Sequence, residues 1–397
     1  MSLRYSIIIP TRERADVLYW SLKTCTMQTY ENLEIIVSDN YSLDDTEQVV
    51  KSAVDERVRY YNTGRRISMS HNWEFALEKA TGDYITILGD DDGFVPNAIE
   101  GINTILSKTK SDALCWHQSK YFWPGNVVYP HSLFIVLRNR VVSIDAQDNL
   151  RKVINHYKHY SSNPWLYSGF VHRSVIDRVK AKSRDAFFHS MIPDIYSGLA
   201  IGSEIDDYMY STGAFSIAGN SSHSNGMSCI SSMEKNRENF NKFLSENPIP
   251  FHSSLELVAS SIPLLVYESA LQLVDLGLID AYHVGLDLKK TLAVCINDSL
   301  QKEEAMKARE IEGLKKVAAK NSIDWDNLYN SASRINPNTS KLKHNLKQRL
   351  IGSKLDGDKI GISNIYEAAL FHERFKRKQF TFGYDLIRML SELKNGK

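Results

Sequence analysis

Short apolar runs alternate with helix-spaced apolar positions along the first third of the chain. The runs are rich in β-branched residues and bounded by turn residues, a pattern typical of buried strands. Between them, apolar residues recur every three or four positions, as Leu18, Leu22 and Cys25 do, which is typical of amphipathic helices. Strands are expected at 5–9, 33–37, 57–61, 83–88 and 113–116.

The spacing of these runs predicts the fold class. Their starts, near 5, 33, 57, 83 and 112, lie roughly 24 to 29 positions apart, which is the length of one strand plus one crossover helix. Such a repeat favours an α/β fold with a Rossmann-like, mainly parallel sheet and helices on both of its faces.

The pattern changes along the second half of the chain. Between 117 and 228 it is mixed, with a strand expected at 214–217, and beyond that point it is helical. We therefore expect two domains, an α/β catalytic domain at 1–228 and an all-helical C-terminal extension at 229–397. Helices in the extension are expected at 233–244, 255–276 and 300–319.

Composition narrows the possible functions. The chain has 397 residues, 43% of them hydrophobic, and a formal net charge of +1. This balance lacks the basic excess of nucleic-acid-binding proteins, so no nucleic-acid partner is expected. The four cysteines are far apart and include no CxxC pair, so neither zinc nor disulfides are indicated and a reducing, cytoplasmic location is expected. No run is long enough to span a membrane.

Polar residues follow each of the first four expected strands. In open α/β sheets, ligands bind at the carboxyl ends of the strands, so these residues are expected to share one crevice. Three consecutive acids after the fourth strand would repel one another unless a cation or polar ligand were bound there. The residues at the four strand ends are Pro10, Thr11 and Arg12; Ser38, Asp39 and Asn40; 62–66, including Arg65 and Arg66; and Asp90, Asp91 and Asp92.

This set of side chains suits a nucleotide diphosphate with a divalent metal. Carboxylates are hard ligands for Mg²⁺ or Mn²⁺, and arginines pair with phosphates. Asp39 can accept a hydrogen bond from a pyrimidine imide. Each feature alone has an ordinary alternative: Asp39 and Asn40 as a turn, the arginines as a solvated loop, and the acids as a helix cap.

Three stretches, in the order and spacing in which they occur, resemble the inverting family-two glycosyltransferases, which have the GT-A fold. The resemblance covers about residues 3–225, and the motifs are specific only when taken together. The stretches are SIIIPTR at 6–12, QTYENLEIIVSDN at 28–40 and ATGDYITILGDDD at 80–92.

The resemblance implies roles for the nucleotide-binding residues. Asp39 matches the acid that binds the uracil or thymine base, and Asn72 matches an asparagine in the helix before the acidic motif. That motif often reads Asp-x-Asp, whereas Gly89 stands here where the first Asp is common. By resemblance to its Asp-Asp variant, Asp90 is assigned to the ribose and Asp91 to the metal. Further metal candidates are Asp92 and, in a late loop, His223.

The resemblance also implies a catalytic base. Asp194, in the stretch 191–195, matches its position best, while Asp206 and Asp207 are rivals and Glu204 is a weaker one. A carboxylate would take the proton of an acceptor hydroxyl. Attack by that oxygen on the side opposite the leaving group would then invert the anomeric centre. Aromatics at Trp123, Trp165 and Tyr167 either stack on sugars or pack in the core.

The implied function is metal-dependent, inverting transfer of a hexosyl or N-acetylhexosaminyl group from a UDP- or dTDP-sugar. The acceptor would be a hydroxyl of a saccharide or a lipid-linked saccharide, in surface polysaccharide biosynthesis. One alternative is a non-catalytic nucleotide-sugar-binding subunit of an assembly complex. Another is a nucleotidyltransferase, which would need a glycine-rich loop after the first strand. Basic amphipathic stretches at 341–354 and 374–382 suggest peripheral contact with the inner face of the plasma membrane.

Overall fold

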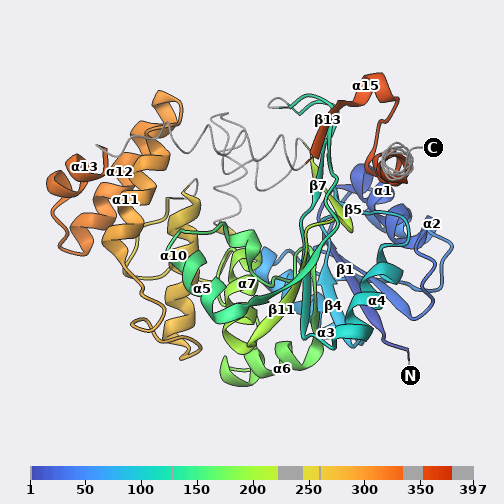
Figure 1. Cartoon of the computed structure of the whole chain (residues 1–397), viewed down its shortest axis with the longest axis horizontal. Coiled ribbons are helices and arrows are strands. Elements are labelled where there is room, and N and C mark those ends of the chain that lie inside the picture. The colour runs from blue at the N-terminus through green and yellow to red at the C-terminus, as the bar shows by residue number, and fades with distance from the viewer. Residues whose placement is uncertain (1, 127–128, 222–244, 259–260, 334–351, 378–397) are drawn as a thin grey trace, which may run out of the picture.

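A large mixed sheet forms the centre of the molecule (Figure 1). The structure is a computed structural model and describes residues 2–126, 129–221, 245–258, 261–333 and 352–377. The main sheet has eight strands in the order β3-β2-β1-β4-β10-β6-β11-β9. Their bounds are β1 Tyr5–Thr11, β2 Leu33–Asp39, β3 Val58–Asn62, β4 Tyr84–Ile87, β6 Ala113–Trp116, β9 Val141–Asp145, β10 Gly169–His172 and β11 Asp207–Ser211.

The first four expected strands pair in parallel, as the repeat predicted. β1 lies between β2 and β4, and β3 lies outside β2. The expected fifth strand, β6, also forms, but β10 lies between it and β4 and runs antiparallel to both. The sheet is therefore parallel across the neighbouring strands β3, β2, β1 and β4, and it becomes mixed from β10 onward.

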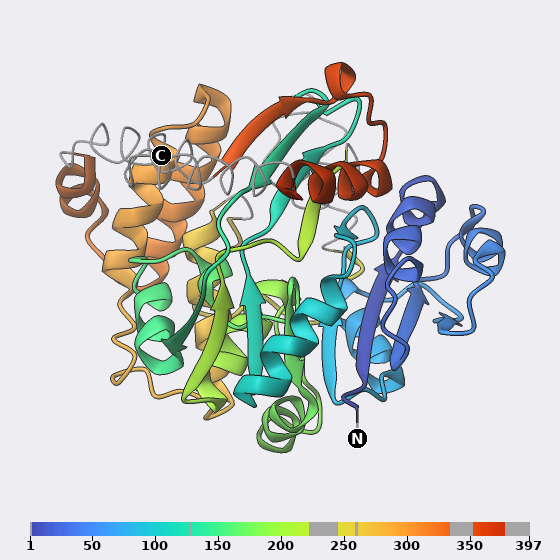
Figure 2. The same ribbon diagram turned by 45° about the vertical axis from the view of Figure 1, so that its right-hand side comes forward.

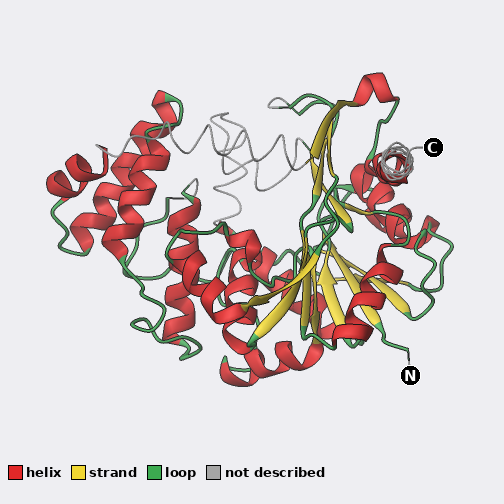
Figure 3. Cartoon of the chain, viewed as in Figure 1, coloured by secondary structure: helices red, strands yellow, loops and turns green. Residues whose placement is uncertain are grey.

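Alternating side chains divide the core between the two faces of this sheet. Ile8, Ile36 and Ile85 belong to one cluster, and Ile7 and Ile35 to the other, since successive strand residues point to opposite faces. Figure 3 shows helices along both faces of the sheet. The bounds of the helices between and after the strands are α1 Ala15–Thr26, α2 Thr46–Ser52, α3 Met69–Lys79, α4 Ala98–Thr109, α5 Ala146–Ile154, α6 Arg173–Lys182 and α7 Pro193–Glu204.

A second sheet of five strands, which the sequence pattern did not predict, lies beside the first. Its order is β13-β8-β7-β12-β5. The strand expected at 214–217 begins two residues later, as β12, and pairs with β5 and β7. The bounds are β5 Gly93–Phe94, β7 Ser119–Phe122, β8 Ser132–Val136, β12 Ser216–Asn220 and β13 Gly352–Asp356.

The C-terminal region is helical, as expected, with one exception. Helices α11 to α13 and part of α10 enclose a hydrophobic cluster of their own, while other residues of α10 belong to the cluster under the main sheet. The expectation of an all-helical extension is wrong for β13, which pairs with β8 because edge strands offer unpaired backbone groups. The bounds are α10 Ile262–Asp275, α11 Leu288–Ser299, α12 Glu304–Lys320, α13 Trp325–Ser333 and α15 Gly357–Ile360.

After β13 the chain returns to its own N-terminal part. Residues 365–377 form a helix whose Ile365, Ala368 and Ala369 are buried in the same cluster as α1 and α4. Lys23 of α1 lies 4.9 Å from the centre of the Tyr366 ring. In Figure 2 this red helix lies near the blue N-terminal helices, whereas the orange helices α11 to α13 lie on the other side.

Several expectations fall on residues that the structure does not describe. These are the helix at 233–244, the division between domains at 228/229, most of the basic stretch at 341–354 and the end of the basic stretch after 377. Within the described ranges, every helix is too short or too polar to form a membrane span.

Candidate functional site

The parallel pairing of β2, β1 and β4 brings their C-terminal ends to one edge of the sheet. Thr11 is paired in register with Asp39, and Ile8 with Ile87, so the residues that follow β4 lie beside the end of β1. The hydroxyl of Thr11 donates to Asp90 at 2.8 Å, which closes the link between two of these ends. The ends of β1, β2 and β4 therefore meet at one edge of the sheet, as predicted.

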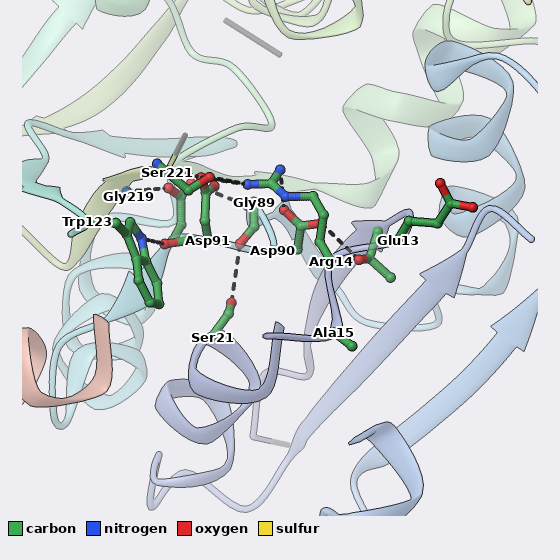
Figure 4. A network of polar contacts seen from close by, with 12 residues as sticks. Glu13, Arg14, Ala15, Ser21, Gly89, Asp90, Asp91, Trp123, Gly219 and Ser221 are labelled. Carbon is green, nitrogen blue, oxygen red and sulfur yellow. Dashed lines mark hydrogen bonds and ion pairs between the residues drawn. The ribbon is translucent and has the colours of Figure 1, made fainter. Parts of the chain in front are cut away.

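A guanidinium group lies between the first two acids of the triplet (Figure 4). Arg14, just before α1, is 2.7 Å from Asp90 Oδ1 and 2.7 Å from Asp91 Oδ2. Ser221 supports Asp91, since its hydroxyl donates to the same oxygen at 2.7 Å and its backbone N–H at 3.2 Å. Two adjacent buried carboxylates thus share one partly buried cation.

Asp92 points into the protein instead. Its Oδ2 accepts a hydrogen bond from the Tyr167 hydroxyl at 2.5 Å, and its Oδ1 accepts one from the backbone N–H of Gly219 at 2.6 Å. The same contacts explain Gly89, because a Cβ there would lie 2.6 Å from the Tyr167 oxygen and 2.9 Å from Asp92 Oδ2. The space that a side chain at 89 would need is filled by Asp92 and Tyr167.

Burial governs the charges of the triplet. Burial raises the pKa of Asp90 to about 6, although the charge of Arg14 acts in the opposite direction. Burial and the charge of Asp91 raise the pKa of Asp92 to about 7. Burial lowers the pKa of Arg14, but the charges of Asp90 and Asp91 outweigh it and hold the pKa above the usual range. A further positive charge nearby, such as a metal ion or a proton, would therefore stabilise the carboxylates of this cluster.

Asp39 is held in place by three donors. Its Oδ2 accepts hydrogen bonds from the Tyr60 hydroxyl at 2.6 Å and from the Asn62 amide at 3.0 Å, and its Oδ1 accepts one from the Ser42 backbone at 2.9 Å. Asn40 shapes the neighbouring loop, because its side chain makes two hydrogen bonds to the backbone of Ile67. Both residues lie at the predicted edge, in a rigid setting.

Three further predicted residues have protein partners. Arg12 forms an ion pair with Glu246, and Arg66 forms one with Glu13. The Asn72 amide oxygen accepts a hydrogen bond from Ser38 at 2.7 Å, which ties α3 to the end of β2. Pro10 is within β1, and His223 lies outside the described residues.

Asp194 lies in the first turn of α7, after Pro193. Its charge raises the pKa of both Tyr160 and Tyr167, so its carboxylate lies near the two phenol groups, although burial is the larger cause for each. Tyr167 in turn donates a hydrogen bond to Asp92, so the charges of the predicted base and of the acidic triplet both act on one phenol group. Burial also raises the pKa of Asp194 itself, a shift that suits a general base.

The rival candidates lie at the other edge of the sheet. Asp206 and Asp207 are exposed at the start of β11, which runs in the same direction as β4 through β6 and therefore begins at the opposite edge. Glu204 ends α7, roughly 15 Å along the helix from Asp194 at 1.5 Å per residue, and pairs with Lys182. Of the four candidates, this arrangement favours Asp194.

The carboxylate oxygens of the acidic triplet fit a divalent metal only in part. Mg²⁺ is usually bound by one or two carboxylates together with substrate phosphates. Asp91, with Asp90 beside it, could supply that number, whereas both oxygens of Asp92 already accept hydrogen bonds. Within the described residues, no group of three or more His, Cys, Asp or Glu side chains has a metal-binding arrangement.

Sequence reasoning missed Arg14 and Ser221 and assigned no polar role to Trp123 or Tyr167. The Trp123 indole donates to the backbone oxygen of Asp91 at 3.2 Å, so it supports the triplet. Arg14 stood in the same polar stretch as Thr11 and Arg12, but only the loop geometry decides which arginine faces the acids. Ser221 is 130 positions from Asp91, and no local signal links them.

Comparisons with known proteins cover mainly the N-terminal part of the chain. Residues 6–170 match the family described as glycosyl transferase family 2. A Campylobacter jejuni relative, GalNAc(5)-diNAcBac-PP-undecaprenol beta-1,3-glucosyltransferase, is 34% identical over 26% of this chain and 34% of its own. The Escherichia coli UDP-Glc:alpha-D-GlcNAc-diphosphoundecaprenol beta-1,3-glucosyltransferase WfaP is 33% identical over 24% of this chain and 38% of its own.

The match thus spans little more than a third of each relative. Among solved structures, S. aureus TarS 1-349 in complex with UDP-GlcNAc is 15% identical, with a TM-score of 0.48 over 83% of this chain and 90% of that one. The family match and the parallel half of the sheet confirm the predicted fold class. Residues 6–170 therefore match glycosyl transferase family 2, within a sheet of the predicted α/β class.

Proposed function

We propose that this chain transfers a sugar from a uridine or thymidine diphosphate sugar to a hydroxyl group, with inversion at the anomeric carbon. The observation that supports this most is the chain of contacts from Arg14 through the acidic triplet to Tyr167, beside which Asp194 lies. The residues that we propose as donor-binding groups would thereby lie close to the proposed base. A binding subunit without activity would have no need of the base.

The donor would lie along the ends of β1, β2 and β4. Asp39, which Tyr60 and Asn62 orient, would accept the imide N–H of the pyrimidine, and Asp90 would bind the ribose hydroxyls. Arg14 would leave the carboxylates and pair with the diphosphate, whose negative charge it matches. Arg12 and Arg66 are further phosphate candidates, each of which would first release its acidic partner.

A divalent ion, Mn²⁺ or Mg²⁺, held by Asp91 would stabilise the negative charge that grows on the leaving diphosphate. Asp92 is the less favoured ligand because Tyr167 and Gly219 occupy its oxygens. Its role in this proposal is to hold Tyr167. His223 remains a candidate for the metal or the diphosphate.

Asp194 would take the proton of the acceptor hydroxyl as its oxygen attacks the anomeric carbon. The raised pKa of Asp194 brings the carboxyl nearer to neutral pH, where a base both holds and releases a proton readily. Attack from the side opposite the leaving diphosphate inverts the anomeric centre. The rings of Trp73 and Trp165 lie near Tyr167 and would form the wall of the acceptor site.

We propose a polyprenyl-diphosphate-linked saccharide as the acceptor, in surface polysaccharide biosynthesis. Support comes from the two bacterial relatives, whose names describe glucosyl transfer to undecaprenol-linked saccharides. A cytoplasmic enzyme at the inner face of the plasma membrane would reach such an acceptor. Glucose is the first donor sugar to test, in a panel that includes N-acetylhexosamines.

Membrane contact through the basic C-terminal stretches is part of this proposal, with a restriction. Phe371 and Phe375 pack partly against the N-terminal core, so they are not free to insert into lipid. The contact would have to come from the basic residues around them and from 334–351 and 378–397. Co-sedimentation with anionic liposomes, with and without residues 378–397, tests it, and equal binding would refute the C-terminal share.

Asp194→Asn is the variant that tests the proposed function. We expect the turnover number for transfer to fall by about 10²–10⁴-fold, the usual contribution of a general base, while UDP affinity stays unchanged. Asp91→Asn should abolish both transfer and the effect of Mn²⁺ on UDP affinity. Near-normal turnover of Asp194→Asn would refute the base assignment, and an inert wild-type protein that still binds UDP-sugars would favour the scaffold alternative.

A further inference from the structure

A buried glutamate of the C-terminal region reaches the segment that carries Asp194. Glu268 of α10 is fully buried, and its Oε2 accepts a hydrogen bond from the Ser190 hydroxyl at 2.8 Å. Ser190 is also fully buried and precedes the proposed base by four residues. This contact joins α10 to the start of α7 across 78 positions of sequence.

The Ser190 hydroxyl contacts the residue that directly precedes α7. It accepts a hydrogen bond from the backbone N–H of Ile192 at 3.2 Å, and Ile192 is the residue that caps α7. Asp194 follows two residues later, in the first turn. Because nine residues of α7 are buried, the helix cannot shift to compensate for a change at its start.

Ser190 is held from two sides. Its backbone oxygen accepts a hydrogen bond from Ser70 of α3 at 2.7 Å, and α3 also carries Asn72 at the nucleotide edge. Its hydroxyl is held by Glu268, whose other oxygen accepts a hydrogen bond from Gln272 at 2.7 Å. The segment before Asp194 is thereby fixed between the nucleotide-binding half and the helical region.

Burying this carboxylate costs free energy that packing alone does not offset. An ionised group loses its hydration when it is buried, and it is tolerated only where hydrogen bonds replace the water. Burial accordingly raises the pKa of Glu268, while its bonds to Gln272 and Ser190 act against that rise. A leucine would fill such a position without that cost, but it could not hold the Ser190 hydroxyl.

We propose that Glu268 is a positioning residue for catalysis, which fixes the Asp194 carboxylate through Ser190 and the first turn of α7. This inference rests on the proposed function of Asp194. It makes the C-terminal helical region part of the catalytic unit, since α10 supplies the group that sets the base. A displacement of a catalytic group by about 1 Å can cost about 100-fold in rate, so a small shift here would be measurable.

The chain offers a matched control in Glu310 of α12. Glu310 is also buried, and it accepts a hydrogen bond from a serine hydroxyl, that of Ser299, at 2.7 Å. It also pairs with Lys302, and it lies in the separate core of α11 to α13. Glu310→Gln therefore disturbs a comparable buried group at a place with no link to Asp194.

The test compares Glu268→Gln, Ser190→Ala and Glu310→Gln in the full chain, with steady-state transfer kinetics and melting temperatures. For the first two variants we expect the turnover number to fall at least about tenfold, while UDP affinity and the KM for the donor stay within about twofold. Glu310→Gln should keep its turnover number within about twofold at a similar melting temperature. Ser190→Thr, which keeps the hydroxyl, should restore most of the activity.

The double variant Glu268→Gln/Ser190→Ala should lose no more activity than the worse single variant, because both changes act on the same hydrogen bond. Equal turnover numbers for Glu268→Gln and Glu310→Gln, or additive losses in the double variant, would overturn the inference. If Asp194→Asn itself keeps its turnover, the proposed function fails. If Asp194→Asn is inactive and Glu268→Gln is normal, only the positioning role fails.

Discussion

Arg14 lies 2.7 Å from Asp91, although 77 positions separate the two residues in sequence. The contact places a permanent cation on the acid that the family resemblance assigns to the metal. Asp90 shares the same guanidinium at 2.7 Å. A divalent ion and Arg14 therefore compete for the same carboxylate, and this competition can be measured.

Arg14→Gln should lower the thermal stability of the metal-free protein. It should also lower the Mn²⁺ concentration that is needed to stabilise the protein. Loss of one partner of a buried ion pair typically costs about 3–5 kcal/mol, so the melting temperature should drop. Mn²⁺ should then raise the melting temperature at lower concentration than in the wild type, because no guanidinium has to be displaced. Thermal unfolding across a Mn²⁺ titration measures both effects.

Arg4→Gln is the control for that experiment, since Arg4 also pairs with a buried acid, Glu34, but at the opposite edge of the sheet. It should lower the melting temperature and leave the Mn²⁺ concentration dependence unchanged. If Mn²⁺ stabilises neither wild type nor Arg14→Gln, the metal assignment of Asp91 is wrong and Arg14 alone supplies the charge.

Gly219→Ala should disrupt the site from the side of β12. A Cβ at this position would lie 1.8 Å from the backbone oxygen of Asp91, a collision that only a backbone shift can relieve. We expect a clear drop in melting temperature and loss of sugar transfer. Gly202→Ala in α7, where the nearest atoms would be 3.8 Å away, should be neutral or stabilising. Normal transfer by Gly219→Ala would contradict the close approach of β12 to the triplet.

The effects of Gly89→Ala and Tyr167→Phe on the free energy of unfolding should not be additive. The alanine Cβ would lie 2.6 Å from the Tyr167 oxygen, so removal of that oxygen makes room for the methyl group. The double variant should therefore be more stable than the sum of the two single effects predicts, by at least about 0.5 kcal/mol. Denaturant unfolding of the four proteins completes the cycle, and additive free energies would show that the two positions do not touch.

Glu34, which lies at the edge of the sheet remote from the site, should make the stability of the protein depend on pH. Burial raises the pKa of Glu34, but hydrogen bonds from Ser6 and Thr81 and the charge of Arg4 outweigh it and hold the pKa below its ordinary value of 4.5. A depressed pKa contributes stability above the unfolded value, and that stability is lost as the pH falls through the folded value.

Glu34→Gln removes this contribution. The difference in unfolding free energy between wild type and variant should be largest at neutral pH and should shrink as the pH falls below about 4.5. Denaturant unfolding at pH 7, 5 and 3.5 measures it. A difference that is constant across this range would mean that Glu34 is not ionised in the folded protein.

The repeat of apolar runs was enough to predict the parallel half of the sheet. Each run of β1, β2 and β4 is buried on both faces, so the pattern is local and strong. The second sheet gave no comparable signal because β5 has only two residues and because β13 pairs with β8 from a distant part of the chain. No local repeat links these segments to one another.

The sequence by itself determined that Thr11, Asp39 and Asp90 meet at one edge, because parallel strands must end together. Only the tertiary structure decided that Arg14 faces the acids while Arg12 and Arg66 do not, that Asp92 turns inward onto Tyr167, and that Glu268 reaches Ser190. The direction of a side chain from a loop depends on partners far away in sequence, and no local pattern of residues encodes those partners.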